Sequence, residues 1–216
     1  MAFAYVAVAT GRVTDTGTTI ACTSSLNVAT GDLLVCWVAW EDGASTIGIS
    51  DGGSNSLTMA SVATDTHNYG CLGYRLAGVA NATATFTGTL GTSRGFRQLI
   101  VMQFQPDSGE TVTTDGTNAT AAGEGNSLLS GSINTAGADV VIVGADKHYA
   151  TQTVTSMQLG GTNAAYSFAN AGWESAMWAR ILTSPGSTLT ATGSIANYTD
   201  WICHIIAFKS EAGGSG

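Results

Sequence analysis

Short apolar runs rich in β-branched and aromatic residues alternate along the chain with clusters of Gly, Asn, Asp and Ser. No window of about a dozen residues keeps the 3.6-residue period of an amphipathic helix. Short runs bounded by turn residues are instead typical of β-strands. The opening segment, residues 1–17, is expected to be a strand. Further strands are expected at 18–24, 32–40, 56–63, 71–77, 82–88, 97–105, 127–134, 139–146, 153–160, 175–182, 187–194 and 200–209.

Several of these strands are apolar on both faces. In DLLVCWVAW (32–40) every position after the first is apolar, and successive side chains of a strand point to opposite faces. Segments 97–105, 139–146 and 200–209 have the same character. A sandwich strand with one face in solvent would alternate apolar and polar residues. We therefore expect these strands to be covered on both sides, and we hypothesise that neighbouring subunits cover some of the outer faces.

Three pairs of residues mark a weak internal repeat. Gly31 precedes an apolar strand as Gly137 does, and Phe104 closes a strand as Phe208 does. Between them, the single arginine of GYRLA has its counterpart in MWARIL. Because order and spacing are kept each time, the chain is predicted to contain a duplicated supersecondary unit.

The predicted fold class is therefore all-β: an antiparallel, jelly-roll-like β-sandwich built from two pseudo-repeated halves. The halves span about 18–105 and 127–209, and a Gly-rich crossover (106–126) joins them. A single domain over 1–209 is preferred, with two small stacked domains as the alternative. Residues 210–216 are expected to be a flexible tail.

Composition excludes several classes of protein. Hydrophobic residues make up 44% of the chain and charged residues 10%, which does not fit a disordered protein. The formal net charge is −8, with only seven Lys and Arg residues. Because phosphates and anionic lipids attract cations, we expect no binding to nucleic acid and none to a membrane surface.

The targeting and cysteine patterns point to synthesis in a cytoplasm. The first residues show no basic region followed by a sustained apolar run and a small-residue cleavage site, and no stretch is long enough to span a bilayer. The four cysteines are far apart and form no C-x-x-C motif. We expect buried free thiols rather than disulfides.

Metal sites are weakly indicated. Glu41, Asp42, Asp51 and Asn55 could supply oxygens to Ca²⁺, but SDGGSN is equally typical of a tight turn between strands. No loop carries the alternating acids of a dedicated calcium motif. We therefore expect no metal and no cofactor.

The histidines and the known catalytic motifs give no positive signal for an enzyme. His67, His148 and His204 are separated by long intervals, without a second His or Cys at zinc-ligand spacing. His204 is expected to be a polar residue at an interface rather than a base. No nucleophile elbow, metalloprotease helix or phosphate-binding loop occurs. The expectation is a protein that is not an enzyme and has no catalytic residues.

Aromatic residues at strand ends are the remaining candidates for a site. Trp40, Tyr69, His148, Tyr149 and Trp173 stand at strand ends or in Gly-rich loops, where exposed rings could stack on sugars or contact a partner. The alternative is that these rings close the ends of the sandwich core.

The order of motifs resembles a family of β-sandwich proteins common in bacteriophage genomes and in large bacterial surface proteins. The resemblance rests on GDLLV, W-x-D, ISDGGSN, GYRLA, ATATFTG, IVMQF and a terminal W-x-x-x-IIAFK, and covers about 18–209. Two segments depart from the family pattern: SDGGSN replaces its usual hairpin, and QFQPDSG replaces an aromatic-Ser-Gly turn.

The resemblance implies a non-enzymatic virion or surface component. It suggests a capsid decoration protein, head fibre or tail accessory subunit, made in the host cytoplasm and located in the virion. Other capsid or tail proteins are the expected partners, in a symmetric homo-oligomer. A carbohydrate-binding adhesin module is the alternative, and a glycan-cleaving enzyme is a third hypothesis.

Overall fold

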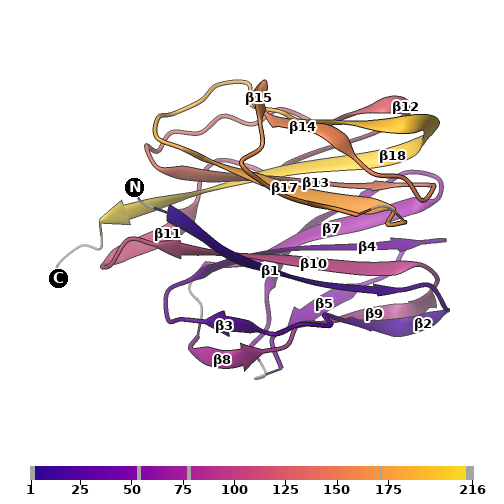
Figure 1. The fold of residues 1–216 in the computed structure, drawn as a ribbon, viewed down its shortest axis with the longest axis horizontal. Helices are drawn as coiled ribbons and strands as arrows, with labels where there is room; N and C mark the ends of the chain where they lie inside the picture. The colour runs from indigo at the N-terminus through magenta and orange to yellow at the C-terminus, as the bar shows by residue number, and fades with distance from the viewer. Residues whose placement is uncertain (1–2, 53–54, 77–78, 171, 213–216) are drawn as a thin grey trace.

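The computed structural model describes residues 3–52, 55–76, 79–170 and 172–212. Every regular element in these ranges is a β-strand, and all the strand pairs between named elements are antiparallel. The predicted all-β, antiparallel sandwich class is therefore confirmed. The described ranges contain no helix long and apolar enough to cross a membrane. The strands stack in four layers, not the two of a simple sandwich (Figure 1).

The first half of the chain forms two of these layers. Its inner sheet has the order β1-β10-β4-β7-β6, from β1 (Phe3–Val13), β10 (Arg97–Pro106), β4 (Leu33–Glu41), β7 (Asn68–Arg75) and β6 (Thr58–Thr64). The outer layer holds the sheet β2-β9-β5 and the pair β3-β8. These strands are β2 (Gly17–Ala21), β9 (Thr87–Arg94), β5 (Ile47–Ser50), β3 (Leu26–Val28) and β8 (Asn81–Ala84).

The second half is one sheet that curls into two layers. Its path is β15-β14-β18-β13-β17-β16, and β11 and β12 also pair with β18. The strands are β11 (Glu110–Thr114), β12 (Ala119–Leu129), β13 (Val140–His148), β14 (Thr155–Leu159), β15 (Thr162–Asn163), β16 (Tyr166–Ala169), β17 (Ser175–Leu182) and β18 (Ala191–Ala212).

The bend of β12 and β18 makes the second half a sandwich. Gly125 has φ +135° beside a register shift, so the two paired strands turn together from the inner layer to the outer one. As a result, residues 191–194 of the strand expected at 187–194 and the whole strand expected at 200–209 belong to one continuous strand, β18, whereas 187–190 lie outside it.

Two expected boundaries also move. The crossover expected at 106–126 contains β11 and the first part of β12. Residues 210–212, expected in a flexible tail, continue β18 and pair with β11. The rest of that expected tail, 213–216, lies outside the described residues.

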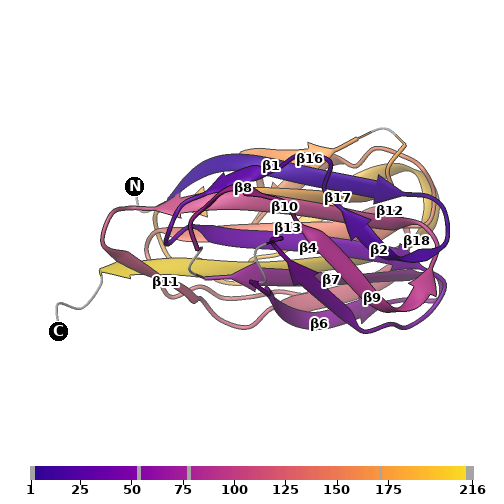
Figure 2. The same cartoon turned by 90° about the horizontal axis from the view of Figure 1, so that it is seen from below.

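Three hydrophobic cores fill the spaces between the layers. The core of the first half lies between its inner and outer layers and includes Ile20, Phe86 and Trp40. The core of the second half lies inside the curled sheet and includes Trp178 and Trp201. A third, central core joins the two inner sheets, whose strands run broadly along the long axis of the molecule (Figures 1 and 2).

Strand β4 is buried on both of its apolar faces. All nine of its residues are buried. Leu33, Val35 and Trp37 enter the central core, whereas Leu34 and Cys36 enter the core of the first half. The chain itself covers both faces, so the two-faced strands give no reason to require a neighbouring subunit.

The domain organisation combines both sequence hypotheses. Each half has its own core, as two stacked domains would, but the central core spans both halves. The inner-sheet order β10-β4-β7-β6 in the first half is matched by β18-β13-β17-β16 in the second. The duplication itself stays a prediction.

All four cysteines are free and buried, as expected. Burial raises the pKa of the Cys22 and Cys71 thiols to about 12. Burial also raises the pKa of Cys36 and Cys203 well above the ordinary value. These side chains act as small apolar groups.

Substituting Gly70 tests the central core. A Cβ at Gly70 would lie 2.3 Å from the ring of Trp37, which is buried and has no room to move. We expect Gly70→Ala to destabilise the protein by about 1–3 kcal/mol through overpacking. Urea denaturation measures this change.

Gly48→Ala is the matched control, because nothing lies within 4 Å of the added atom. It should change the free energy of unfolding by no more than about 0.5 kcal/mol. Equal effects of the two substitutions would contradict the tight packing of the central core around Trp37.

Candidate functional site

At one end of the central core the apolar packing between the two halves gives way to polar side chains. On β13, Val141, Val143 and Ala145 face this core, and alternation places Lys147 on the same face. On β4, the same face ends at Glu41. The two charged residues therefore meet across the boundary between the halves.

Lys147 is fully buried and completely bonded. Its Nζ donates to Oε1 of Glu41 at 3.0 Å, to Oε2 of Glu174 at 2.7 Å and to the carbonyl oxygen of His148 at 2.9 Å. An ammonium has three protons, and all three have an acceptor here. Lys147 thus fixes both carboxylates and has no proton left for a ligand.

The two carboxyl groups titrate differently. Burial raises the pKa of Glu174 to about 7, and its hydrogen bond with Glu41 adds to the shift. Burial also acts to raise the pKa of Glu41. There, the hydrogen bond from Glu174 and the charge of Lys147 outweigh it and lower that pKa. Of the two carboxyl groups, Glu174 is therefore the one that takes up a proton more readily as the pH falls through the neutral range.

Further polar pairs flank this cluster. Ser175 hydrogen-bonds the side chain of Gln98 across the boundary between the halves. On the opposite face of β13, Nδ1 of His148 lies 2.6 Å from Oδ2 of Asp146, and Nε2 lies 3.2 Å from the carbonyl oxygen of Gln152.

A cavity of about 230 Å³ opens beside the two carboxylates. Its lining consists of Glu41, Phe96, Tyr149, Ala150 and Glu174. The side chains of Glu41 and Glu174 are 12% and 7% exposed, so both carboxylates reach the cavity while remaining largely buried.

The aromatic part of the lining is held in place by the surrounding chain. The Tyr149 amide donates to the carbonyl oxygen of Asp200 at 3.0 Å, and its own carbonyl accepts from Oγ1 of Thr199 at 2.6 Å. Its ring packs against His67, with centroids 5.0 Å apart, and is nearly half exposed. Tyr149 thus presents an accessible aromatic face on a backbone that two hydrogen bonds hold, with one side of the ring against His67.

Phe96 forms another part of the wall in a strained turn. Its φ is +43°, in the left-handed region that non-glycine residues rarely adopt. The guanidinium of Arg12 lies 5.1 Å from the ring centroid, and the carbonyl of Gly95 accepts a bond from the Glu41 amide. The turn is therefore tied to the carboxylate cluster.

The predicted aromatic candidates do not form one surface. Trp40 is fully buried, stacks on the half-buried Tyr69 at 5.9 Å, and donates its Nε1 proton to the carbonyl of Gly43. His148 is buried in the pair described above. Trp173 packs edge-on against Phe168 at 4.8 Å. Only Tyr149 is well exposed, so the structure places the others as closures of the core ends.

The suggested calcium ligands are dispersed or already bonded. Asp51 is fully buried and accepts from both terminal nitrogens of Arg75 and from the side chain of Asn55. Asp42 is exposed with φ +62°, and Glu41 bonds Lys147. Within the described ranges no group of three or more His, Cys, Asp or Glu side chains is placed to hold a metal ion.

His204 lies inside the molecule, at the boundary between the halves. Neither ring nitrogen has a hydrogen-bond partner, and the ring meets Trp37 edge-on at 6.0 Å. Burial lowers the pKa of His204 from 6.5 to about 3, so the ring is neutral at physiological pH. The sequence led us to expect His204 at an interface, and the structure places it between the two halves of the same chain.

Sequence reasoning passed over Lys147 and Glu174 and considered Glu41 only as a calcium ligand. One signal was present: Lys147 occupies a core-facing position of an apolar strand, where a charged residue needs a buried partner. The partner itself comes from 27 or 106 residues away, a pairing that only the folded chain reveals.

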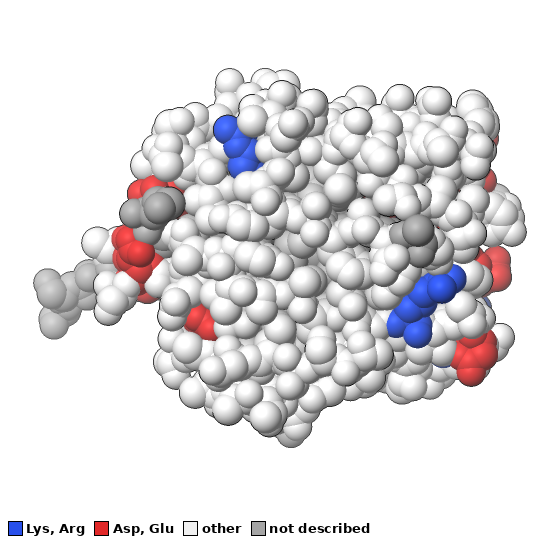
Figure 3. Space-filling view, in the orientation of Figure 1, with Lys and Arg blue, Asp and Glu red and all other residues white. Residues whose placement is uncertain are grey.

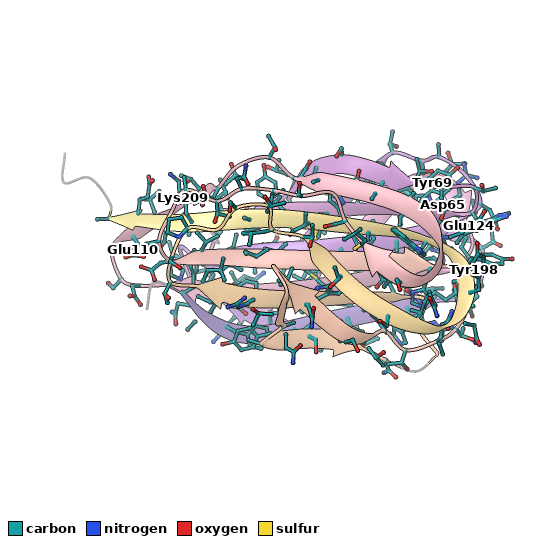
Figure 4. All side chains as sticks on the ribbon, turned by 90° about the horizontal axis from the view of Figure 1, so that it is seen from above. Asp65, Tyr69, Glu110, Glu124, Tyr198 and Lys209 are labelled. Carbon is teal, nitrogen blue, oxygen red and sulfur yellow. The ribbon has the colours of Figure 1, made fainter. Side chains whose placement is uncertain are left out.

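A second group of side chains lies at the same end of the molecule. Asp65, Tyr69, Glu124 and Tyr198 gather there, whereas Glu110 and Lys209 mark the other end (Figure 4). The exposed Tyr198 donates to Glu124 at 3.0 Å. This contact raises the pKa of Tyr198.

No family model, no curated protein and no solved structure matches this chain. The resemblance to the phage-associated sandwich family therefore stays a prediction, and the function rests on the chain's own physics.

Lys147→Met tests the buried ion cluster. Removing the ammonium leaves two buried carboxyl groups without their cation, so we expect a loss of about 3–5 kcal/mol of stability at pH 8. The loss should be smaller at pH 5, because both carboxyl groups can then take up protons. Urea denaturation at both pH values measures it.

Lys209→Met is the control, since its pair with Glu211 lies at the surface. We expect no measurable change from it. A Lys147→Met protein that is as stable as the parent at pH 8 would contradict the assigned cluster.

His204→Phe tests the neutral buried imidazole. A folded-state pKa lowered to about 3 means that the unfolded chain binds the proton first, so this stability is present above pH 6.5 and is lost as the pH falls towards 3. At pH 4 the variant should exceed the parent in unfolding free energy by about 3 kcal/mol relative to their difference at pH 7. Parallel urea curves at the two pH values decide the point, and an equal difference at both would refute it.

Proposed function

We propose that this chain is a non-enzymatic structural protein of a bacteriophage virion: a capsid decoration protein, head fibre or accessory subunit that acts through protein–protein contacts. The observation that carries the proposal is the four-layer packing, in which three cores join the chain into one thick slab of β-structure. A rigid slab suits a subunit whose work is to bind neighbours and bridge them.

The arrangement of the charged side chains supports a non-catalytic role. Every one of the seven Lys and Arg residues contacts another group of the same chain: Arg12, Arg75, Arg94, Arg97, Lys147, Arg180 and Lys209. Charged groups are also sparse on the face shown in Figure 3. This distribution supports the absence of a phosphate-binding surface in the proposal.

The carboxylate pair also favours a structural role over glycan cleavage. A glycosidase holds its two carboxyl groups apart, with room for the bond to be cut and, in inverting enzymes, for a water molecule. Here Glu41 and Glu174 both accept a hydrogen bond from the ammonium of Lys147, so a buried cation is bonded to both carboxyl groups and is placed where it would interfere with a bond to be cut.

The proposed partners are other capsid or tail proteins, together with copies of this chain in a symmetric assembly. Since the chain covers both of its inner sheets, such contacts use the outer layers and the edge strands. The sheet β2-β9-β5 offers an outer face on which Thr89 of β9 is exposed between the buried Gly88 and Leu90. The proposed homo-oligomer follows from the symmetry of virions, in which structural proteins occur in many copies. It does not depend on an uncovered apolar face of this chain.

A carbohydrate-binding adhesin module is the second candidate function. The observation that favours it is Tyr149, which the chain holds rigid and exposed next to two carboxylates. Exposed rigid aromatic rings beside hydrogen-bonding groups are a common way to bind sugars.

Location on the particle tests the structural proposal. We expect mass spectrometry of purified phage particles to find this chain in stoichiometric amounts. A reconstruction should show four-layered β density on the head exterior or at the tail. Its absence from washed particles that are otherwise complete would contradict the proposal.

A further inference from the structure

The cavity beside Glu41 and Glu174 has features that protein stability alone does not explain. A buried ion cluster contributes little net stability, because desolvation offsets most of the attraction. Here the carboxyl groups of Glu41 and Glu174, both bonded to the buried Lys147, line a cavity next to a strained Phe96 and an exposed Tyr149. Shifted carboxyl groups beside a cavity are more frequent at binding sites than elsewhere.

The hydrogen-bonding groups of this cavity are mainly acceptors. Lys147 donates its three ammonium protons to protein oxygens, so it orients the carboxylates and does not bind a ligand itself. A carboxylate has about four lone-pair directions, and those not used by Lys147 or by the partner carboxyl group remain. A ligand that fits must therefore donate hydrogen bonds.

The charge of the cluster favours a neutral donor over a cation. Lys147 lies between the two carboxyl groups and compensates the charge of one, and burial raises the pKa of the other, Glu174, to about 7, which reduces its average charge near neutral pH. The remaining negative charge attracts an ammonium or guanidinium ligand only weakly. Hydroxyl groups, in contrast, need only hydrogen-bond acceptors. Sugars and polyols offer adjacent hydroxyl groups of this kind.

The size and shape of the cavity further restrict the class of ligand. The cavity, at about 230 Å³, is smaller than pockets for drug-sized ligands, which run from about 300 to 1,000 Å³. The fixed ring of Tyr149 offers a flat apolar face, which matches the C–H face of a pyranose ring. A larger hollow of about 470 Å³ at the other end of the molecule has only loop and strand-end residues (30–32 and 105–110), with no aromatic ring.

We propose that this cavity binds one neutral pyranose unit of a glycan, stacked on Tyr149, with adjacent hydroxyl groups donating to Glu41 and Glu174. Phe96 closes the apolar side of the cavity, and Lys147 is a positioning residue. The inference rests on the second candidate function, carbohydrate binding. The proposed structural role does not depend on it.

The test uses the whole chain, labelled with ¹⁵N, and a panel of methyl pyranosides of glucose, galactose, mannose and N-acetylglucosamine. Titration by amide NMR should show at least one pyranoside shifting the signals of Tyr149 and Ala150. Tyr149→Ala should weaken that pyranoside by about tenfold or more, the loss of one stacked ring. Because the Tyr149 side chain is half exposed and its backbone makes the loop's bonds, the variant should fold, and unchanged amide signals elsewhere would verify this.

Tyr198→Ala is the matched control, because Tyr198 is another exposed tyrosine at the same end of the molecule. It should leave the affinity within about twofold of the parent. Glu41→Gln should weaken the same pyranoside, since the pKa of Glu41 is lowered and an amide replaces one acceptor oxygen of its carboxylate with a donor.

Each other outcome is decisive. If a pyranoside binds but shifts signals elsewhere, or is insensitive to Tyr149→Ala, carbohydrate binding stands and this site is wrong. If no pyranoside binds, the site and the second candidate function both fail, while the presence of the chain on particles still tests the structural role. If methylguanidinium shifts the Tyr149 signals and no pyranoside does, the cavity is a cation site and the proposal is overturned.

Discussion

Burial of the two inner sheets on both faces is the constraint on which the rest of the structure depends. An outer layer covers one face of β4, and the other half of the chain covers the second. Fully burying one Leu, Val or Phe side chain contributes about 1.5–3 kcal/mol, whereas a buried ion cluster adds little net stability. The apolar central core, rather than Lys147 and its partners, therefore holds the halves together.

The polar end of that core is nevertheless where a buried ion cluster meets a cavity. Where the apolar rows of β4 and β13 stop, Glu41 and Lys147 face each other, and Glu174 completes the cluster. A misaligned boundary would leave these charges buried without partners, at a cost of several kcal/mol. The cluster thus favours one register of the halves, and it also fixes the carboxylates at the edge of a small cavity.

Both features support the adhesive role that we propose. The slab provides rigidity, and its cations are engaged within the chain. Its surface is mostly uncharged but carries acidic groups at the ends, and it exposes strand edges and aromatic rings such as Tyr149 and Tyr198. Binding by area suits the virion role that we propose. Binding by ring stacking at Tyr149 would add recognition of a glycan to the same scaffold.

The sequence by itself determined the fold class, the free buried thiols and the position of the strands with two apolar faces, because side-chain alternation is a local property. It did not determine the number of layers. A strand buried on both faces has the same sequence pattern whether a neighbouring subunit or another part of its own chain covers it. The short outer strands β3 and β5 and the edge strand β16 were missed, because weakly patterned segments become strands only when a partner pairs with them. Tertiary structure alone decided the site: a buried lysine needs a partner, but Glu41 and Glu174 become its partners only when the two halves stack.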